Sequence, residues 1–260
     1  MKKTLRYILI GCCGALLAAC MVLAYINGTE SRKEILCKGI ITSVIDSLEN
    51  SFVTSSEVKK FIDKEYGQYL DLPIDSINLT RIERIIDGRS AVKKSQAYVT
   101  RDGMLHIDVT QRKPVVRFQK SDGGFYADAE GFIFPLQHTY ASHVQVIDGN
   151  IPLAANSGYK GHINSKEELK WFKDMMKVVN FVETDKVWKD KIVQIHVNAD
   201  HDLVIIPREG HEYFIFGQPD RIEDKFHKMG KYYTHIIPAK GEKHYREIDL
   251  RFKGQIVCRK

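Results

Sequence analysis

The sequence lacks the residue patterns by which catalytic and metal-binding proteins are usually recognised. It contains no CxxC or HExxH spacing, which are the ligand patterns of common zinc sites. It also contains no GxSxG turn, no SxxK pair and no glycine-rich phosphate loop. These absences exclude the familiar motifs of zinc enzymes, serine hydrolases and nucleotide-binding proteins. We therefore expect no metal and no cofactor.

Cysteine is scarce outside a single apolar run near the N-terminus. Of the five cysteines, Cys12, Cys13 and Cys20 lie in that run, whereas Cys37 and Cys258 lie near opposite ends of the remaining chain. Exported proteins that depend on disulfide bonds carry cysteines densely. Cys37 and Cys258 could pair in an oxidising compartment, but two distant cysteines make a poor framework. We expect two free thiols.

Charge is absent between Tyr7 and Ile26, and Lys2, Lys3 and Arg6 lie just before this run. A helix over 7–26 would be roughly 30 Å long, the thickness of the hydrocarbon core of a bilayer. Basic residues stay on the cytoplasmic side of a membrane. The sequence therefore predicts a transmembrane helix over 7–26, with residues 1–6 in the cytoplasm and the rest outside.

A second interpretation of the same run is a cleaved lipoprotein signal. Leu17-Ala18-Ala19-Cys20 resembles a bacterial lipoprotein box, which would make Cys20 the lipidated residue. Cleavage before Cys20 would leave the apolar residues 21–26 beside the lipid, whereas a continuous span uses them. The length of the run favours the uncleaved anchor, and both interpretations export the rest of the chain.

No cluster of basic and aromatic residues is present that would predict a nucleic-acid groove. The net charge is +6, but the lysines and arginines are interspersed with acidic residues along the chain. The apolar fraction of 43% and the charged fraction of 28% are those of globular protein. Roughly 230 residues follow the apolar run, which is enough for two domains of ordinary size.

The first domain is predicted over 37–112, after a polar tether over 27–36. A β-branched strand at 40–45 precedes a helix that begins with the capping box Thr54-Ser55-Ser56-Glu57. A second helix is predicted from about Thr80 to Gly88. Asp102-Gly103 then joins two alternating segments, the strongest local signal for a hairpin. The order strand, helix, helix, strand, strand predicts an α+β domain with both helices on one face of the sheet.

The second domain is predicted over 113–260, from the junction at Pro114. It alternates short apolar segments with glycine and aspartate turns, which indicates a mainly β domain. Two amphipathic helices are expected, one over 165–182 and one that starts at Pro219 and continues through Tyr233. The expected strands lie at 115–118, 125–127, 132–134, 144–147, 192–197, 203–206, 213–216, 245–252 and 255–258.

Histidines and carboxylates that lie near one another in the sequence are the candidates for catalytic or metal-binding groups. His196, His201 and His211 lie near Asp200, Asp202 and Glu212, and Asp128 lies near Glu130. None of these sets has a ligand spacing with a mechanism behind it, and the residues fall on alternating strands or hairpin turns. We expect neither an enzyme nor a small-molecule substrate.

A series of short motifs, in this order and spacing, resembles the FtsQ/DivIB family of bacterial cell-division proteins over nearly the whole chain. The junction Gln111-Arg112-Lys113-Pro114 is similar to the family's Glu-Arg-x-Pro, with Gln in place of Glu. The ending resembles the Bacteroidetes branch of the family. The other motifs are Asn50-Ser51-Phe52-Val53, Asp75-Ser76-Ile77-Asn78-Leu79, Asp102-Gly103, Phe125-Tyr126-Ala127-Asp128, Gly131-Phe132-Ile133-Phe134 and Ile248-Asp249-Leu250-Arg251-Phe252.

The resemblance implies a POTRA domain followed by a β domain in a bitopic inner-membrane protein, with both domains in the periplasm. It implies a non-enzymatic role at the division septum. The implied partners are the single-span coiled-coil division proteins FtsB and FtsL, other divisome proteins and the inner membrane, with no nucleic acid.

The resemblance also implies where a partner binds. In this family the segment after the Asp-Leu-Arg-aromatic motif receives a partner strand, which here corresponds to Phe252, Lys253, Gly254, Gln255, Ile256 and Val257. Phe252 would be an aromatic anchor, and Gly254 would allow close backbone approach. The alternative for Phe252 is an ordinary core position of a terminal strand. Because the printed chain ends soon after its last expected strand, contacts that relatives make through a longer tail are expected to be absent or replaced.

Two other functions remain as alternatives from the sequence. A POTRA protein of outer-membrane assembly or secretion would normally carry a membrane barrel after its POTRA modules. An anchored cell-wall hydrolase or transferase would need His196, Asp128 or Glu212 to converge in a pocket.

Overall fold

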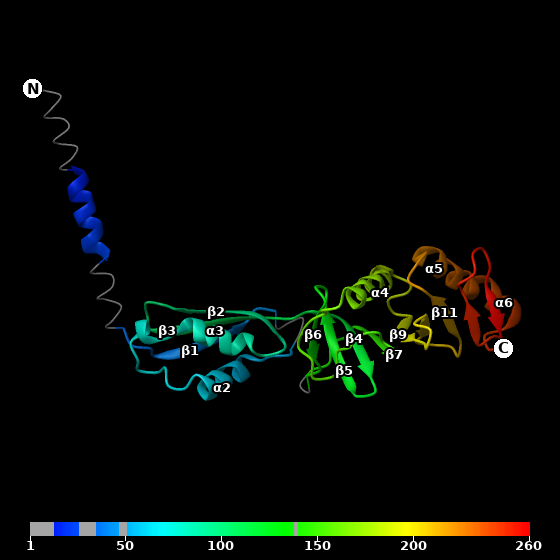
Figure 1. The fold of residues 1–260 in the computed structure, drawn as a ribbon, viewed down its shortest axis with the longest axis horizontal. Coiled ribbons are helices and arrows are strands. Elements are labelled where there is room, and N and C mark those ends of the chain that lie inside the picture. Colours follow the sequence, from blue (N-terminus) through cyan, green and yellow to red (C-terminus); the bar gives the residue numbers. More distant parts are fainter. Residues whose placement is uncertain (1–12, 26–34, 47–50, 138–139) are drawn as a thin grey trace, which may run out of the picture. The chain divides into compact units, whose positions relative to one another are not determined.

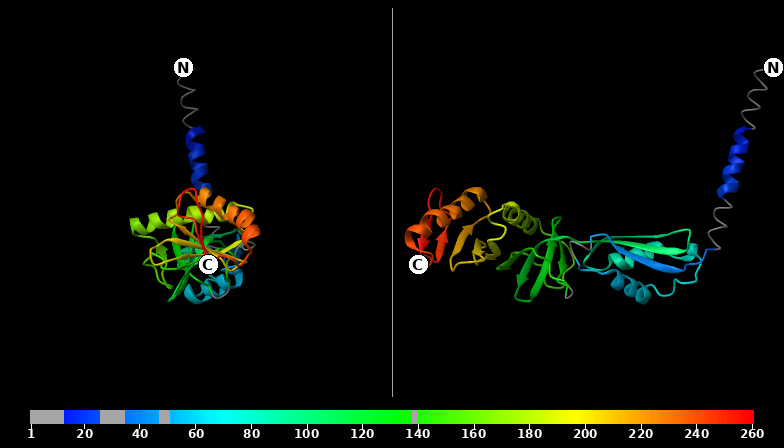
Figure 2. Two further views of the ribbon diagram at one scale, coloured as in Figure 1. Left: turned by 90° about the vertical axis from the view of Figure 1, so that its right-hand side faces the viewer. Right: turned by 180° about the vertical axis from the view of Figure 1, so that it is seen from behind.

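The computed structural model describes residues 13–25, 35–46, 51–137 and 140–260. The chain divides into two compact units, residues 1–111 and residues 112–260. Figures 1 and 2 show the elements of each unit in chain order, coloured from blue to red.

The predicted transmembrane helix is only partly covered by the described residues, of which 13–25 are helical. Across the residues that the structure describes, no helix combines the length and the apolar character needed to cross a bilayer. The rest of the predicted span, residues 7–12 and 26, lies outside the described residues. The same is true of the predicted cytoplasmic segment 1–6 and of residues 27–34 of the tether.

The first unit contains a three-stranded sheet in the order β1-β3-β2. Strand β3 (Met104–Gln111) lies in the centre, parallel to β1 (Gly39–Val44) and antiparallel to β2 (Val92–Val99). Alternate residues of β3, Leu105, Ile107 and Val109, are fully buried. This period of two confirms the alternation from which the hairpin was predicted.

Helices α2 (Ser55–Glu65) and α3 (Leu79–Asp87) contribute the other half of this core, through Val58, Ile62, Ile82 and Ile86. The predicted capping box is present: Thr54 Oγ1 accepts from the Glu57 amide at 3.3 Å, and the Thr54 amide donates to the Glu57 carboxylate at 3.0 Å. Helix α3 starts one residue earlier than predicted because the side chain of Asn78 caps it. A short 3₁₀ turn, η1 (Ile74–Ser76), joins the helices and was not predicted.

The second unit contains a ten-stranded mixed sheet in the order β13-β12-β11-β10-β9-β7-β4-β5-β6-β8. Pairing is parallel between β4 and β7, β7 and β9, and β11 and β12, and antiparallel elsewhere. The strands are β4 (Pro114–Lys120), β5 (Gly123–Asp128), β6 (Phe132–Pro135), β7 (Gln145–Gly149), β8 (Gly161–His162), β9 (Ile192–Val197), β10 (Leu203–Pro207), β11 (Tyr213–Gly217), β12 (Glu247–Asp249) and β13 (Val257–Arg259).

Two helices, α4 (Lys166–Thr184) and α5 (Ile222–Lys231), pack along the same side of this sheet (Figures 1 and 2). The rings of Phe181 in α4 and Phe226 in α5 stack with their centroids 4.5 Å apart. Phe226 also contacts the ring of Phe216 in β11, at 5.3 Å between centroids. These aromatic contacts join the helices to each other and to the sheet in one apolar core, as the predicted amphipathic stripes require.

Several predictions for this unit were wrong in detail. Helix α5 begins at Ile222, not at Pro219, because Arg221 has a left-handed backbone (φ 46°) that ends the preceding turn. The predicted continuous helix through Tyr233 passes at Lys231 into a π-helical segment, η2 (Tyr232–Ile236), and then into α6 (Ile237–Lys240). The predicted strand 245–252 is limited to β12, and the predicted strand 255–258 is β13, shifted toward the C-terminus. Strand β8 was not predicted.

Candidate functional site

The terminal hairpin, β12 and β13 with the segment 250–256 between them, forms one edge of the ten-stranded sheet. Strand β13 pairs with β12 on one side, and no described strand lies on its other side. An edge strand exposes backbone N–H and C=O groups that an extended segment from another chain can bind. This edge is therefore the candidate site.

The hydrogen bonds of β12 establish which backbone groups of β13 point away from the sheet. The Tyr213 amide donates to the Arg246 carbonyl at 2.8 Å, and the Leu250 amide donates to the Ile215 carbonyl at 2.9 Å. The Arg246 carbonyl and the Leu250 amide thus face β11, whereas the Arg246 amide donates to the Arg259 carbonyl at 2.9 Å, and Glu247 and Asp249 face β13. Their register partners, Arg259 and Val257, direct their backbone groups toward β12. Since successive residues of a strand direct these groups to opposite sides, the backbone groups of Cys258 point outward.

Side chains of the hairpin differ sharply in exposure. Ile248 and Leu250 are fully buried, whereas 44% of Phe252 is exposed, so Phe252 is not a core residue. Lys253, Gly254 and Gln255 are exposed, and Gly254 has a positive φ of 73° in the turn that reverses the chain. Ile256 and Cys258 pack against the core, and burial raises the pKa of the Cys258 thiol. Val257 is partly buried, and its backbone pairs with Asp249.

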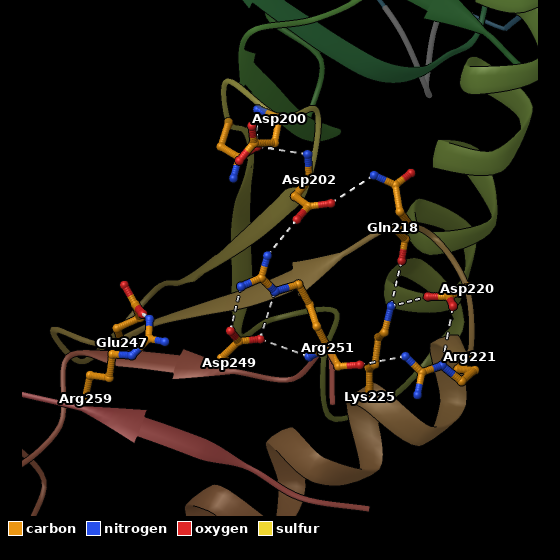
Figure 3. Close-up of polar contacts among 11 residues, drawn as sticks. Asp200, Asp202, Gln218, Asp220, Arg221, Lys225, Glu247, Asp249, Arg251 and Arg259 are labelled. Carbon is orange, nitrogen blue, oxygen red and sulfur yellow. Dashed lines mark hydrogen bonds and ion pairs between the residues drawn. The ribbon is translucent and has the colours of Figure 1, made fainter. Parts of the chain in front are cut away.

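A polar network around the buried carboxylates of Asp249 and Asp202 holds the start of this segment (Figure 3). The Arg251 guanidinium donates to both carboxylate oxygens of Asp249, at 3.0 and 2.7 Å, and to the Asp202 carboxylate at 3.1 Å. Gln218 donates to the other oxygen of Asp202 at 2.9 Å. Burial by itself raises the pKa of Asp249, but the hydrogen bonds from Arg251 outweigh it and the net pKa is lowered. The network connects residues at the ends of β10, β11 and β12 to Arg251, two residues after β12.

Cationic side chains in and just before α5 hold the carbonyl groups of Leu250, Arg251 and Phe252. Lys228 Nζ donates to the carbonyls of Leu250 and Phe252 at 3.2 and 2.7 Å, and Arg221 donates to the carbonyl of Arg251 at 2.8 Å. These contacts explain why β12 is shorter than predicted, since the carbonyls that would extend the strand already have partners. Lysine is usually exposed, so the sequence contained no signal for these contacts.

A row of polar side chains crosses the exposed face of the same edge. Tyr213 donates to the Glu247 carboxylate at 3.0 Å, and Glu247 forms an ion pair with Arg259 (Figure 3). The three residues are register neighbours on β11, β12 and β13. A strand added to β13 would place its own side chains next to Arg259 and Val257 on this face.

Comparison with known protein families identifies both units. Residues 113–259 match the family model described as FtsQ/DivIB, C-terminal related, and residues 35–110 match the model of a POTRA-like domain. The chain belongs to the FtsQ/DivIB family. This confirms the resemblance found in the sequence, together with an α+β fold whose first domain is POTRA-like. A comparison with curated proteins finds no match.

The family assignment indicates a role in bacterial cell division, with other division proteins as partners and a membrane-associated location at the septum. FtsQ/DivIB and POTRA domains are non-enzymatic scaffolds.

The predicted histidine and carboxylate candidates occupy separate places in this FtsQ/DivIB chain. His196 bonds to Asp148 at 2.9 Å, His201 bonds to the Asn150 carbonyl at 3.0 Å, and Asp128 pairs with Arg112 at 2.9 Å. Within the described ranges, no group of three or more potential metal ligands is present.

Only His211 and Glu212 of those candidates line the open pocket of about 1090 Å³ near the start of β11. Glu212 accepts a hydrogen bond from the Tyr233 hydroxyl at 2.9 Å, and burial together with this carboxylate raises the pKa of Tyr233. The pocket contains acidic and basic side chains together, and its lining residues include no serine, threonine or cysteine.

Proposed function

We propose that this protein is a non-enzymatic scaffold of the divisome that captures an extended segment of an FtsB- or FtsL-type protein by strand addition to β13. The observation that carries the proposal is the position of β13 at the sheet edge, with the backbone of Cys258 directed outward. Strand addition uses the partner's main chain for affinity and its alternating side chains for selectivity.

The two edges of the ten-stranded sheet support the choice of β13 over β8. Strand β8 has only two residues, and the Tyr159 hydroxyl donates to the carbonyl of His162 at 2.8 Å. The Tyr159 ring also covers Gly161, because a Cβ built there would lie 3.1 Å from the Tyr159 hydroxyl. A short edge that is covered by a side chain resists pairing with another strand. Strand β13, in contrast, pairs only with β12 among the described strands, and residues 251–255 before it are exposed.

The predicted contact residues fit this role in different ways. Phe252, Lys253, Gly254 and Gln255 present side chains or a turn to a partner, and Phe252 is the aromatic anchor. Ile256 supplies outward backbone groups next to those of Cys258, because strand residues alternate. Val257 directs its backbone inward, so its contribution is made through its side chain.

The proposal includes the membrane topology. The apolar run over 7–26 anchors the chain in the inner membrane, with the N-terminus in the cytoplasm and both folded units in the periplasm. Anchoring keeps both units on the periplasmic side of the membrane, where the outer segments of single-span partners emerge. A tagged chain is then expected to gather at midcell in dividing bacteria, and a uniform distribution would contradict this part of the proposal.

The binding test uses a proline at the residue whose amide points outward. Cys258→Pro removes that amide and leaves the inward amides of Val257 and Arg259 in place, so the fold is expected to persist. Capture of a purified FtsB- or FtsL-type outer region from the same bacterium should be lost. Cys258→Val is the matched control, because it changes the same side chain and keeps the amide.

The proposal is contradicted if the proline variant captures both partner regions as well as the valine variant does. A proline at Val257 is less informative, because it removes an amide that faces β12 and so disturbs the hairpin itself. Thermal unfolding of each variant shows whether the fold has been preserved.

A further inference from the structure

The segment between β12 and β13 is held by Lys228 in α5 and by Arg221 just before it, which restricts where a partner can pair. Three consecutive carbonyls, those of Leu250, Arg251 and Phe252, accept hydrogen bonds from Lys228 or Arg221. We infer that Lys228, assisted by Arg221, positions the terminal hairpin as a preformed docking edge and confines strand addition to residues 256–260. This inference rests on the proposed function, and it adds the residues that prepare the binding edge.

Lys228 is buried to an extent that is unusual for lysine, with 5% of its side chain exposed. Its ammonium group donates to the carbonyls of Leu250 and Phe252 and pairs with Asp224 at 3.0 Å. Burying an ammonium group is costly unless its donors are satisfied. The three partners satisfy its three N–H donors, so the ammonium fixes the backbone on both sides of Arg251.

Arg221 holds the carbonyl between those two. Its backbone is left-handed, with φ 46°, at the residue before α5. Such a conformation is uncommon for a residue other than glycine, and it is retained only where the surroundings compensate for the strain. Its guanidinium donates to the Arg251 carbonyl at 2.8 Å, which provides one such contact.

These contacts act directly on the predicted anchor and on the turn that follows it. Phe252 keeps 44% of its surface exposed while its carbonyl is bound by a buried ammonium. The turn at Lys253 and Gly254 starts from that fixed carbonyl and leads into β13. A segment that is ordered before binding loses less conformational freedom when a partner pairs with it. The α5 cations therefore raise the affinity of β13 without touching the partner.

Lys225 provides a matched control on the same helix. It is buried like Lys228, with 1% of its side chain exposed. Its ammonium donates to the Gln218 carbonyl at 2.7 Å and to the Asp220 carboxylate, and it lies 4.8 Å from the centroid of the Phe216 ring. These contacts stabilise the connection before α5, and none of them involves residues 250–259.

The experiment compares Lys228→Met and Lys225→Met in the full chain, purified in detergent. Amide hydrogen exchange of residues 253–259 is measured in the free protein, together with the Kd for a synthetic peptide covering the outer segment of the FtsB-type protein. Lys228→Met should raise both the hairpin exchange rate and the Kd by about 10-fold. Lys225→Met should lower the Tm and leave both values close to those of the unaltered chain. Lys228→Arg, which keeps a cation near the carbonyls, should recover part of the affinity.

The inference is overturned if Lys228→Met leaves the hairpin exchange and the Kd unchanged, or if Lys225→Met alters them to the same degree. The two proposals fail in different ways. If the unaltered chain does not bind the peptide, the proposed function is contradicted for this partner. The exchange rates of the free protein still decide whether Lys228 orders the hairpin.

Discussion

The guanidinium of Arg251 binds both carboxylate oxygens of Asp249, two residues earlier in the chain, at 3.0 and 2.7 Å. The two partners are buried unequally, since the Asp249 side chain is fully buried and 42% of the Arg251 side chain is exposed. The ion pair therefore stabilises the hairpin mainly by neutralising a carboxylate that water cannot reach.

This inequality predicts different costs for the two alanine variants. Arg251→Ala leaves a buried carboxylate without its cation and should lower the free energy of unfolding by about 3 kcal/mol. Asp249→Ala leaves an arginine that can still contact Asp202 and water, and should cost about 1–2 kcal/mol. Both tryptophans, Trp171 and Trp188, lie in the second unit, so urea unfolding followed by tryptophan fluorescence reports on this unit. Equal costs, or a larger cost for Asp249→Ala, would show that the pair is not controlled by burial.

Acidification should weaken the same pair. The folded-state pKa of Asp249 is lowered, so its contribution to stability is present above the ordinary aspartate pKa of about 4. That contribution is lost as the pH falls through the lower, folded-state value. In a pH series, the free energy of unfolding of Asp249→Asn should fall less steeply below about pH 4 than that of the unaltered chain. Parallel curves would contradict the assignment.

Exposure of Phe252 predicts that it affects binding more than stability. Phe252→Ala should change the free energy of unfolding by less than about 0.5 kcal/mol and raise the Kd for the FtsB-type segment by at least about 10-fold. Leu250→Ala, two residues earlier and fully buried, should instead cost about 2–5 kcal/mol of stability. Calorimetric binding and urea unfolding of both variants separate the two effects. A core role for Phe252 would appear as a large loss of stability.

The outer edge of β2 in the POTRA-like unit is covered by two carboxylates of α3. The Ser95 amide donates to Asp87 at 2.8 Å, and the Ala97 amide donates to Glu83 at 2.9 Å. Replacing both carboxylates by alanine should free these amides for pairing with another chain. Light scattering should then show concentration-dependent self-association. The control variant, Glu65→Ala with Asp75→Ala, removes the same charge elsewhere in this unit and should not self-associate.

The turn at Gly103 depends on the absence of a side chain. Its φ is 87°, and a Cβ built there would lie 2.4 Å from the carbonyl oxygen of Leu36. Gly103→Ala should lower the free energy of unfolding of the first unit by about 1–3 kcal/mol, which amide exchange of β2 and β3 would detect.

Gly230→Ala in α5 is expected to have the opposite effect on stability. Apart from the neighbouring backbone of α5 itself, no atom lies within 4 Å of a Cβ at that position, so the substitution should stabilise the second unit by about 0.5–1 kcal/mol.

Features that depend on a few neighbouring residues could be predicted from the sequence. The capping box at Thr54, the hairpin at Asp102-Gly103 and the amphipathic α4 are all present. Each is determined by turn chemistry or by hydrophobic periodicity over a short window, which the linear sequence displays.

Predictions at the candidate site were less complete because they depended on distant contacts. Tertiary hydrogen bonds from α5 to the carbonyls of 250–252 end β12 early, and no local pattern encodes them. The same applies to the start of α5, where the guanidinium of Arg221, whose backbone is left-handed, contacts a residue thirty positions away.

A POTRA-like module followed by a strand-rich domain of the FtsQ/DivIB family could be predicted from the amino-acid order, because local periodicity and the order of motifs are visible there. The folded structure was needed to show that β13 lies at the edge of the sheet, that the backbone of Cys258 faces outward, and that Lys228 is buried against the hairpin. Strand order and the burial of a charge depend on which distant segments meet, and their free energies are determined by that packing rather than by neighbouring residues.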